Sequence, residues 1–444
     1  MRPDVKVVLW SLGVTLWVSA ACLDCGAQSL GRRDIIGDDE NHFNCYPRLE
    51  DGSCGNGGGP TATACAESAV TPQLYQACDL LTPSTATGTA TFESLTDAIA
   101  TVQDSNQDGR LVVCARYNLT FVPSHSADTI SLGRANVELR SSAVNRRPLI
   151  LVRPEDYVTN ALYVSGPGTV ISDLRFSLPG ANTHANGVNI YNTEVRALRN
   201  LCFQSSQFGS AISSFQSKIA LVQDIAIFGQ DFTGGNGLQV SSSEVALIKA
   251  TKASNINVAI SISNSTVGSI DEFVATNGDR AISLANADVG MIRGMVVNEH
   301  VKGVELWQSK LGSLEETMIQ VPWFDFHGAF TPYGVTASGS LTVPSIIGNL
   351  KNLTLPLGDG GVGVGLDIAQ VRSIDGLSIA GPIGSGCNPT GNGITVSRSG
   401  VTLINNTNVV SCGSALSIYG NPTHPSRVLS RVSTSLQSAH GASP

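Results

Sequence analysis

Charged residues are scarce in this sequence, and those present are not predominantly basic. They make up 14% of the 444 residues, and the formal net charge at pH 7 is −8. A surface that binds nucleic acid is expected to be basic, so the charge balance argues against a nucleic-acid partner. Low charge combined with many short runs of β-branched residues favours an all-β extracellular protein.

Long apolar runs are also absent after the first residues. Val7–Leu23 is apolar, Arg2 and Lys6 precede it, and small residues up to Ala27 follow it. We interpret residues 1–27 as a secretory signal peptide, which predicts a secreted or cell-surface protein with no membrane span after cleavage. A retained membrane anchor is the alternative, because the run is near the minimum length for a span.

Cysteine is infrequent and unevenly distributed. Cleavage after Ala27 removes two of the ten cysteines and leaves eight (10 − 2), an even number that favours disulfides over metal ligands in an exported chain. Four lie in the Gly- and Thr-rich segment 28–90, which we expect them to staple: Cys45, Cys54, Cys65 and Cys78. Cys387 and Cys412 lie on neighbouring repeats and are expected to pair, whereas Cys114 and Cys202 either pair or are simply buried.

What the sequence does contain is a repeat. A small residue, an aliphatic residue, any residue and a second apolar residue recur in this order, and three successive copies are evenly spaced: Ala259–Ile262, Ala281–Leu284 and Gly303–Leu306. Each copy has a small residue six positions after its first residue and aliphatic residues at eight and eleven. Such a unit cannot bury its own apolar face, so the copies must stack on one another.

The pattern extends in both directions from these evenly spaced copies. Its first residue, which we call the anchor, recurs along the chain at similar but unequal intervals. The Gly334 copy matches least well, since Ala337 stands where an aliphatic residue is expected. The anchors are Ala161, Gly187, Ala211, Gly237, Ala259, Ala281, Gly303, Gly334, Gly365, Gly393 and Ala415.

The local periodicity indicates strands. Apolar residues alternate with a period of two around Ile260, Ile282 and Val304, and the Leu-x-x-Leu-x-Leu pattern of a leucine-rich repeat is missing. We therefore predict an all-β fold, a right-handed parallel β-helix solenoid of about 11 turns. With about 4.8 Å between stacked strands, its length would be about 50 Å.

The ends of such a rod need covers, because unpaired strand edges invite aggregation. Residues 92–102 have helical spacing and predict an N-terminal cap helix within a segment 91–150 that also holds the first strands. The β-helix itself is predicted over 151–422. The segment 423–444 forms either a short capping helix around Val428–Leu436 or a disordered tail.

Three features resemble a known group of proteins. Phe92–Val113, then Ala135–Ser141, then the evenly spaced turns resemble the pectin-lyase-like right-handed parallel β-helix superfamily over residues 92–420. That superfamily includes pectate lyases, polygalacturonases, epimerases, phage tailspikes and non-catalytic surface proteins. The Asn-Thr-Asp, Asp-Asp, Gly-His-Gly and Arg-Ile-Lys set of polygalacturonases is missing, as is the Asp-Pro-His-Asp of alginate epimerases. The resemblance therefore carries over no named activity.

The resemblance implies that a polysaccharide site would use the outward side of one strand row. The outward residues are the third of each repeat, and most are small and polar: Tyr163, Asn189, Ser213, Gln239, Ser261, Ser283, Glu305, Asp367, Thr395 and Ser417. Hydroxyl and amide groups hydrogen-bond glycans, but they are equally the ordinary residues of a solvated strand.

One part of this row differs from the rest. Arg280 and Lys302 precede successive anchors and should stack about 5 Å apart. Asp279, Glu299, His300 and Glu305 surround them. Stacked cations repel unless a carboxylate or an anionic ligand lies between them. Either the carboxylates neutralise an exposed pair that contributes little, or the group binds an acidic sugar.

The next interval, from Gly303 to Gly334, is longer than those before it, and the insertion brings Trp323, Asp325, His327 and Tyr333 close to the same place. Long loops on solenoids often form the binding face, aromatic rings suit the C–H faces of sugars, and a His beside an Asp can transfer protons. The alternative is a hydrophobic plug that seals a cleft.

The segment after the predicted cap helix resembles the start of a calcium loop. Asp104, Asn106 and Asp108 occupy ligand positions 1, 3 and 5, but Ala115 stands at position 12, where a carboxylate is required. A tight turn between helix and strand is the better interpretation, and no cofactor is expected.

These observations predict a protein that binds or processes an extracellular, acidic polysaccharide or cell-surface glycan. If it is an enzyme, a lyase or hydrolase mechanism would use six residues: His300, Lys302, Arg280, Glu305, Asp325 and His327. Trp323, Tyr333 and Asp279 would bind the substrate. The alternative is a non-catalytic structural or adhesive surface protein, which the missing motifs favour.

Overall fold

The structure is a computed structural model. The chain divides into two compact units, Met1–Gly58 and Gly59–Pro444, and every described residue lies in the second. The described residues are 78, 80–82, 109–115, 119–121, 129–141, 147, 149–152, 160–178, 186–205, 209–229, 235–320, 331–358, 360–381, 391–411, 413–420 and 424–438. The predicted signal peptide, the cap helix at 92–102, the candidate calcium residues Asp104, Asn106 and Asp108, and the pair Cys387–Cys412 lie outside them.

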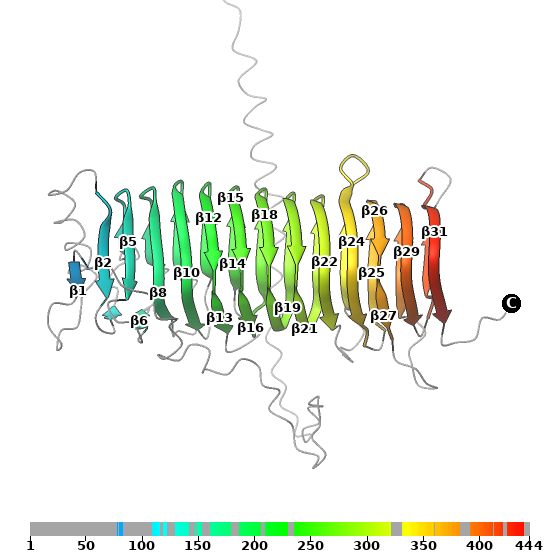
Figure 1. The fold of residues 1–444 in the computed structure, drawn as a ribbon, viewed down its shortest axis with the longest axis horizontal. Coiled ribbons are helices and arrows are strands. Elements are labelled where there is room, and N and C mark those ends of the chain that lie inside the picture. The colour runs from blue at the N-terminus through cyan, green and yellow to red at the C-terminus, as the bar shows by residue number, and fades with distance from the viewer. Residues whose placement is uncertain are drawn as a thin grey trace, which may run out of the picture. The chain divides into compact units, whose positions relative to one another are not determined.

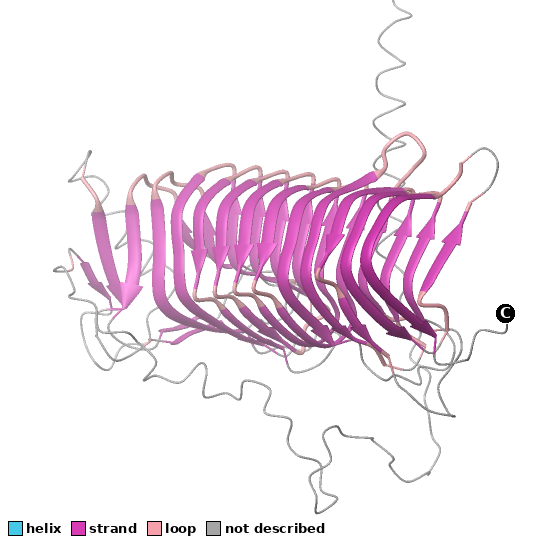
Figure 2. Cartoon of the chain, turned by 45° about the vertical axis from the view of Figure 1, so that its right-hand side comes forward, coloured by secondary structure: helices cyan, strands magenta, loops and turns pink. Residues whose placement is uncertain are grey.

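The described part of the second unit is a parallel β-solenoid of about ten turns, which confirms the predicted fold (Figure 1). Its strands are stacked from β1 (Leu80–Thr82) to β31 (Arg427–Ser438), and no helix occurs among the described residues. Figure 2 shows how the longer strands bend from one side of the solenoid to the next.

The strands form three rows, which we call A, B and C. Row A holds the repeat anchors and carries the predicted site. It consists of β4 (Ile130–Leu132), β7 (Asn160–Val164), β9 (Asn186–Tyr191), β11 (Ser210–Phe215), β14 (Asn236–Ser241), β17 (Val258–Ser263), the last parts of β19 (Val274–Ala285) and β21 (Val296–Trp307), then β23 (Tyr333–Ser338), β25 (Val362–Asp367), β28 (Asn392–Ser397) and β30 (Leu416–Tyr419).

Row B follows row A in each turn. It consists of β1, β2 (Leu111–Ala115), β5 (Val137–Ser141), the first parts of β8 (Thr169–Leu178) and β10 (Glu194–Ser205), then β12 (Lys218–Gln223), β15 (Glu244–Lys249), β18 (Thr266–Asp271), β20 (Asp288–Arg293), β22 (Lys310–Gln320), β24 (Ser345–Pro356), β26 (Ala369–Asp375), β29 (Gly400–Ser411) and β31.

Row C completes each turn. Its separate strands are β3 (Leu119–Phe121), β6 (Leu149–Val152), β13 (Ala226–Gly229), β16 (Lys252–Ser254) and β27 (Ser378–Ala380). The remaining places are filled by the second parts of β8, β10, β22, β24, β29 and β31 and by the first parts of β19 and β21.

The core is a set of stacked aliphatic columns. Ile260 lies beside Ile282 and Ile282 beside Val304 on successive strands, and all three side chains are buried. The repeat was expected to place them in this way, because residues two apart in a strand face the same side. The predicted register is therefore confirmed for these turns.

The register prediction was wrong for one turn. Gly334 lies beside Gly363, not Gly365, because Val335 pairs with Val364 and Thr336 with Gly365. The segment after Gly361 fits the repeat pattern in two frames two residues apart, and both frames keep the same residues inward. Asp367, predicted as the third residue of its copy, is therefore the fifth: it lies beside Ser338 on the neighbouring strand and still faces outward, with its side chain 43% exposed.

Neither alternative given for the C-terminal segment, a capping helix or a disordered tail, describes residues 427–438. Residues Arg427–Ser438 form β31, which pairs in parallel with β29 along its length. Val428 and Leu436 pack against the core, whereas Leu429 and Val432 are exposed. The backbone N–H and C=O groups of β29 would lack partners without another parallel strand beside them. Pairing these groups stabilises a strand more than the weak helical spacing of residues 428–436 stabilises a helix.

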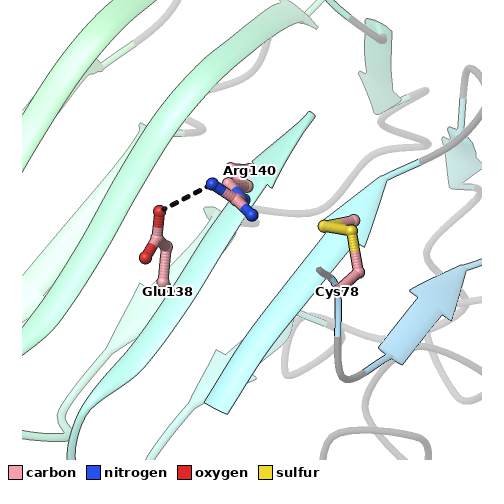
Figure 3. The surroundings of a disulfide bond; sticks show 4 residues. Cys78, Glu138 and Arg140 are labelled. Carbon is pink, nitrogen blue, oxygen red and sulfur yellow. Dashed lines mark ion pairs between the residues drawn. A yellow bond between two sulfur atoms is a disulfide. The ribbon is translucent and has the colours of Figure 1, made fainter. Parts of the chain in front are cut away.

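Cys114 is buried, as one of the two alternatives expected, but it also pairs with a cysteine that neither alternative named. A disulfide joins Cys78 to Cys114 on β2, so Cys78 ties its segment to the solenoid instead of stapling the segment internally (Figure 3). Pairing of Cys114 with Cys202 is excluded, and Cys202 is itself disulfide-bonded.

Candidate functional site

The predicted cation pair exists on row A. Arg280 on β19 and Lys302 on β21 are direct register partners on adjacent strands. Both side chains are partly exposed, at 38% for Arg280 and 24% for Lys302. The equal spacing of these turns in the sequence produces the stack, because each strand begins at the same point of its turn.

Glu305 holds the two cations together. Its Oε1 lies 2.5 Å from Nζ of Lys302, and its Oε2 lies 3.1 Å from Nε of Arg280. Oδ2 of Asp279 lies 3.2 Å from the same Nε, although neither contact to this nitrogen has hydrogen-bond geometry. The result is a compact cluster of two cations and two carboxylates, which we call the Arg280–Lys302 cluster.

His300 lies on the same strand but does not belong to this surface. It is 1% exposed, and its Nδ1 lies 3.0 Å from the carbonyl oxygen of Asn298. Burial lowers the pKa of His300 to about 4. The ring fits against Gly278 on the preceding turn, where a Cβ would come within 2.7 Å of Nε2. His300 therefore lies away from the solvent that a bound glycan would displace.

Glu299 stands at the corner that precedes row A. It has φ = 56°, as do the equivalent corner residues of the two preceding turns, Asn277 at 56° and Asn255 at 55°. Burial raises the pKa of Glu299. Its side chain makes no ion pair with a described residue, so it is placed near the cluster without joining it.

Tyr333 continues the column of Arg280 and Lys302. It pairs with Lys302 on the next strand, as the longer interval predicts once the insertion is passed. Its ring lies over Gly365, where a Cβ would come within 2.9 Å of Cε1. The other insertion residues of the predicted site, Trp323, Asp325 and His327, lie outside the described residues, so their roles remain predictions.

Row A carries a second surface feature, which the sequence analysis missed. Tyr191 and Phe215 are register partners with ring centroids 5.7 Å apart and an interplanar angle of 13°. Tyr163 stacks on Tyr191 at 6.5 Å. Tyr191 and Phe215 are 43% and 39% exposed, respectively. We call these three residues the aromatic ladder.

A signal for this ladder was present in the sequence. Tyr191 and Phe215 each follow their anchor by four positions, in two successive copies of the repeat. The predicted outward row includes only the third residue of each repeat. Because side chains alternate along a strand, the fifth residue faces the same side. Tyr163 alone was identified.

Amide side chains flank the aromatic ladder. Asn186 donates a hydrogen bond from Nδ2 to Oδ1 of Asn160, at 2.9 Å, on the preceding strand. Oγ of Ser210 lies 2.8 Å from Oε1 of Gln239 across the following strands. Because these groups bond one another between turns, their remaining donors and acceptors are held at fixed positions on row A.

The ladder and the Arg280–Lys302 cluster share one row. Six strand pairings lead from β7, which carries Tyr163, to β21, which carries Lys302. At about 4.8 Å for each step, the two features span about 29 Å. Small polar residues, including Ser261 and Ser283, occupy the outward positions between them.

Among the described residues there is no group of His, Cys, Asp and Glu that would suit a metal ion. These residues also contain no helix long and apolar enough to cross a membrane.

No protein-family model and no curated protein matches this chain. Solved structures with a similar backbone include the catalytic domain of a GH87 alpha-1,3-glucanase in complex with nigerose, with 12% identity and a TM-score of 0.49 over 82% of this chain and 70% of that chain. Tailspike protein 3 of bacteriophage CBA120 has 13% identity and a TM-score of 0.31 over 79% and 60% of the respective chains. PfbA, a surface adhesin of Streptococcus pneumoniae, has 10% identity and a TM-score of 0.27 over 77% and 87%. At these values the similarity concerns the path of the backbone alone.

Proposed function

We propose that the protein is an extracellular polysaccharide-binding protein whose ligand lies along the outward surface of row A. The observation that carries the proposal is the exposed aromatic ladder, Tyr163–Tyr191–Phe215. Three stacked rings at the surface keep apolar area in water, and such patches mark interaction sites. Flat rings with neighbouring amides match a sugar, which has an apolar C–H face and a rim of hydroxyl groups.

The Arg280–Lys302 cluster supports an acidic glycan. The contacts of Arg280 with Asp279 and Glu305 both use Nε, and a guanidinium has two further nitrogens that donate hydrogen bonds. A carboxylate on the ligand would bind there without displacing Glu305. Stacked cations of this kind orient an anionic group strongly because the hydrogen bonds are charge-assisted.

The Cys78–Cys114 disulfide supports the extracellular location. Disulfides persist in oxidising compartments and are rare in the cytosol. This agrees with the predicted signal peptide at residues 1–27.

A lyase or hydrolase is the catalytic form of the same proposal. Proton transfer would fall to Lys302 and Glu305, which are in direct contact at the surface, with Asp325 and His327 as the predicted partners from the insertion. The buried His300 fits a supporting role better than a proton carrier. Product release from polygalacturonate or alginate, followed by ultraviolet absorbance and reducing ends, distinguishes this form from a non-catalytic adhesive protein.

The decisive experiment removes the aromatic ladder. The double variant Tyr191→Ala, Phe215→Ala should be retarded less in affinity electrophoresis through polygalacturonate, alginate or dextran, with binding about tenfold or more weaker for the retained glycan. Tyr419→Ala is the matched control, because Tyr419 occupies the same column on β30 and is 57% exposed. It lies four strand pairings beyond β21, outside the stretch of row A between the aromatic ladder and the Arg280–Lys302 cluster. Equal retardation of the ladder variant and the wild type would overturn the proposal, as would no retardation of the wild type by any glycan.

A further inference from the structure

A second charged surface lies away from row A. A cleft of about 820 Å³ opens at the corner where row B gives way to row C. Six cations and three carboxylates line it: Arg110, Arg140, Arg147, Arg196, Arg199, Lys252, Glu138, Asp173 and Asp224. The formal charge of the lining is +3 (6 − 3), in a chain whose net charge is −8. We call it the basic cleft.

The floor of the basic cleft is a buried network. Arg140 and Glu138 on β5 are 8% and 6% exposed, and Nη1 of Arg140 lies 3.7 Å from Oε1 of Glu138 (Figure 3). Arg147 is 6% exposed and donates a hydrogen bond from Nη2 to Oδ1 of Asn200. These contacts fix the positions of the guanidinium groups, so the floor is built before any ligand arrives.

The rim of the basic cleft is accessible. Arg196 and Arg199 on β10 and Lys252 on β16 are exposed, and none of the three forms an ion pair with another described residue. Arg196 lies at an irregularity in the pairing of β10 with β8, between Val195 and Ala197. Three such cations above buried ones raise the local potential and attract anions.

The burial of Arg147 also favours an anionic ligand in the basic cleft. Desolvation lowers the pKa of Arg147, the carboxylate of Asp173 raises it, and the nearby Arg175 lowers it. An anion in the cleft would favour the charged guanidinium as Asp173 does.

We propose that the basic cleft binds an anionic saccharide, one that carries carboxylate or sulfate groups. The cleft has the size of a small-ligand site. Its amide and hydroxyl groups, from Asn136, Ser172, Asn200 and Gln223, suit sugar hydroxyls. No aromatic side chain lines it among the described residues, whereas surfaces for single-stranded nucleic acid combine cations with aromatic rings that stack the bases. The proposal extends the proposed function by a second site for the acidic glycan class.

The test uses the full chain and calorimetric titration with oligogalacturonate, a sulfated oligosaccharide and a single-stranded oligonucleotide. The double variant Arg196→Ala, Arg199→Ala should bind the better of the two saccharides about tenfold or more weakly. The control variant Lys218→Ala, Lys310→Ala removes two exposed cations of row B outside the basic cleft and should bind as the wild type does. Lys252→Gln provides a single-charge check that keeps the side chain long.

The outcomes separate this proposal from the first. If the Arg196→Ala, Arg199→Ala variant loses saccharide binding and the Tyr191→Ala, Phe215→Ala variant retains it, the basic cleft is supported. This conclusion does not depend on whether row A binds a glycan. Unchanged saccharide binding by the cleft variant overturns the basic cleft and leaves row A standing. Tighter binding of the oligonucleotide than of either saccharide, or no anion binding by the wild type, also overturns it.

Discussion

His300 and the Arg280–Lys302 cluster are neighbours in sequence but belong to different environments. Lys302 and Glu305 meet at the surface, while the ring of His300 lies in the interior beside Gly278. In a β-strand successive side chains point to opposite sides, yet Glu299 interrupts the alternation with φ = 56°. Directly after this corner His300 is buried, whereas the Lys302 side chain, two residues later, is 24% exposed.

The burial of His300 predicts a pH-dependent stability. Its pKa is about 4 in the folded chain, against 6.5 for an unperturbed His. Above pH 6.5 the ring is neutral in both states, and this stability is fully present. As the pH falls from 6.5 towards 4, the unfolded chain binds the proton first, so the free energy of unfolding falls by about 3 kcal/mol in total.

The measurement compares urea unfolding at pH 7.5 and pH 5.0 for the wild type and His300→Gln. The wild type should lose about 2 kcal/mol more than the variant over this interval, because Gln does not titrate. Using the difference between two pH values cancels any constant effect of the substitution. Parallel pH profiles for the two proteins would show that His300 is protonated equally in both states.

At the scale of elements, hydroxyl groups link the turns where row A passes to row B. The backbone N–H of Ser217 donates to Oγ of Ser243 at 3.1 Å, and the N–H of Ser243 donates to Oγ of Ser265 at 3.0 Å. The N–H of Ala287 donates to Oγ of Ser309 at 3.1 Å. The residue six positions after each anchor must therefore be small and, where it is Ser, also accepts a hydrogen bond, since its hydroxyl satisfies a backbone donor of the previous turn.

This ladder of hydroxyl groups has one gap among these turns, at Ala287, which offers no side-chain acceptor to the N–H of Ser265. Ala287→Ser should raise the free energy of unfolding by about 0.5–1.5 kcal/mol, the usual contribution of a hydrogen bond. The new hydroxyl would donate to the carbonyl of Ala285, as Oγ of Ser265 donates to the carbonyl of Ser263 at 2.6 Å. Chemical denaturation measures the change.

Ala246→Ser is the matched control for this prediction, because Ala246 is exposed on β15 and a hydroxyl there stays in water. A gain in Ala287→Ser that is no larger than in Ala246→Ser would contradict the assignment of the gap.

The stacking of row A could be predicted because its information is local: a period of two within strands and an equal spacing of the anchors Ala259, Ala281 and Gly303. That spacing was enough to place Arg280 beside Lys302. The frame at Gly363 was not predictable, since two overlapping frames bury equivalent residues. Nor was the inward turn of His300, which depends on a backbone angle at the preceding residue and on the space above Gly278.

At the scale of the whole solenoid, the surface separates chemical properties by row. Row A presents rings, amides and one cluster of balanced charge, whereas the corner between rows B and C concentrates cations. A parallel solenoid makes this possible, because each position in the repeat defines a continuous column along the rod. The fold thus spaces binding groups along the solenoid by whole numbers of turns.

This fixed spacing predicts how the affinity for a glycan depends on the length of the glycan. The aromatic ladder and the Arg280–Lys302 cluster are joined by six strand pairings, or about 29 Å. A fragment that reaches both ends binds the second end at high effective concentration, whereas a shorter one gains nothing from it. The dissociation constants of a size series of oligogalacturonates, measured by calorimetry, should therefore fall with length and level off once the span is bridged.

The variant Arg280→Gln, Lys302→Gln removes the cations of the Arg280–Lys302 cluster and leaves the aromatic ladder unchanged. For this variant the dissociation constant should level off at a shorter length, because only the aromatic ladder and the amides beside it remain to be filled. The Tyr191→Ala, Phe215→Ala variant should likewise lose its length dependence from the opposite end. If short fragments bound the wild type as tightly as long ones, the two features would act as separate sites, and a glycan extended along row A would be excluded.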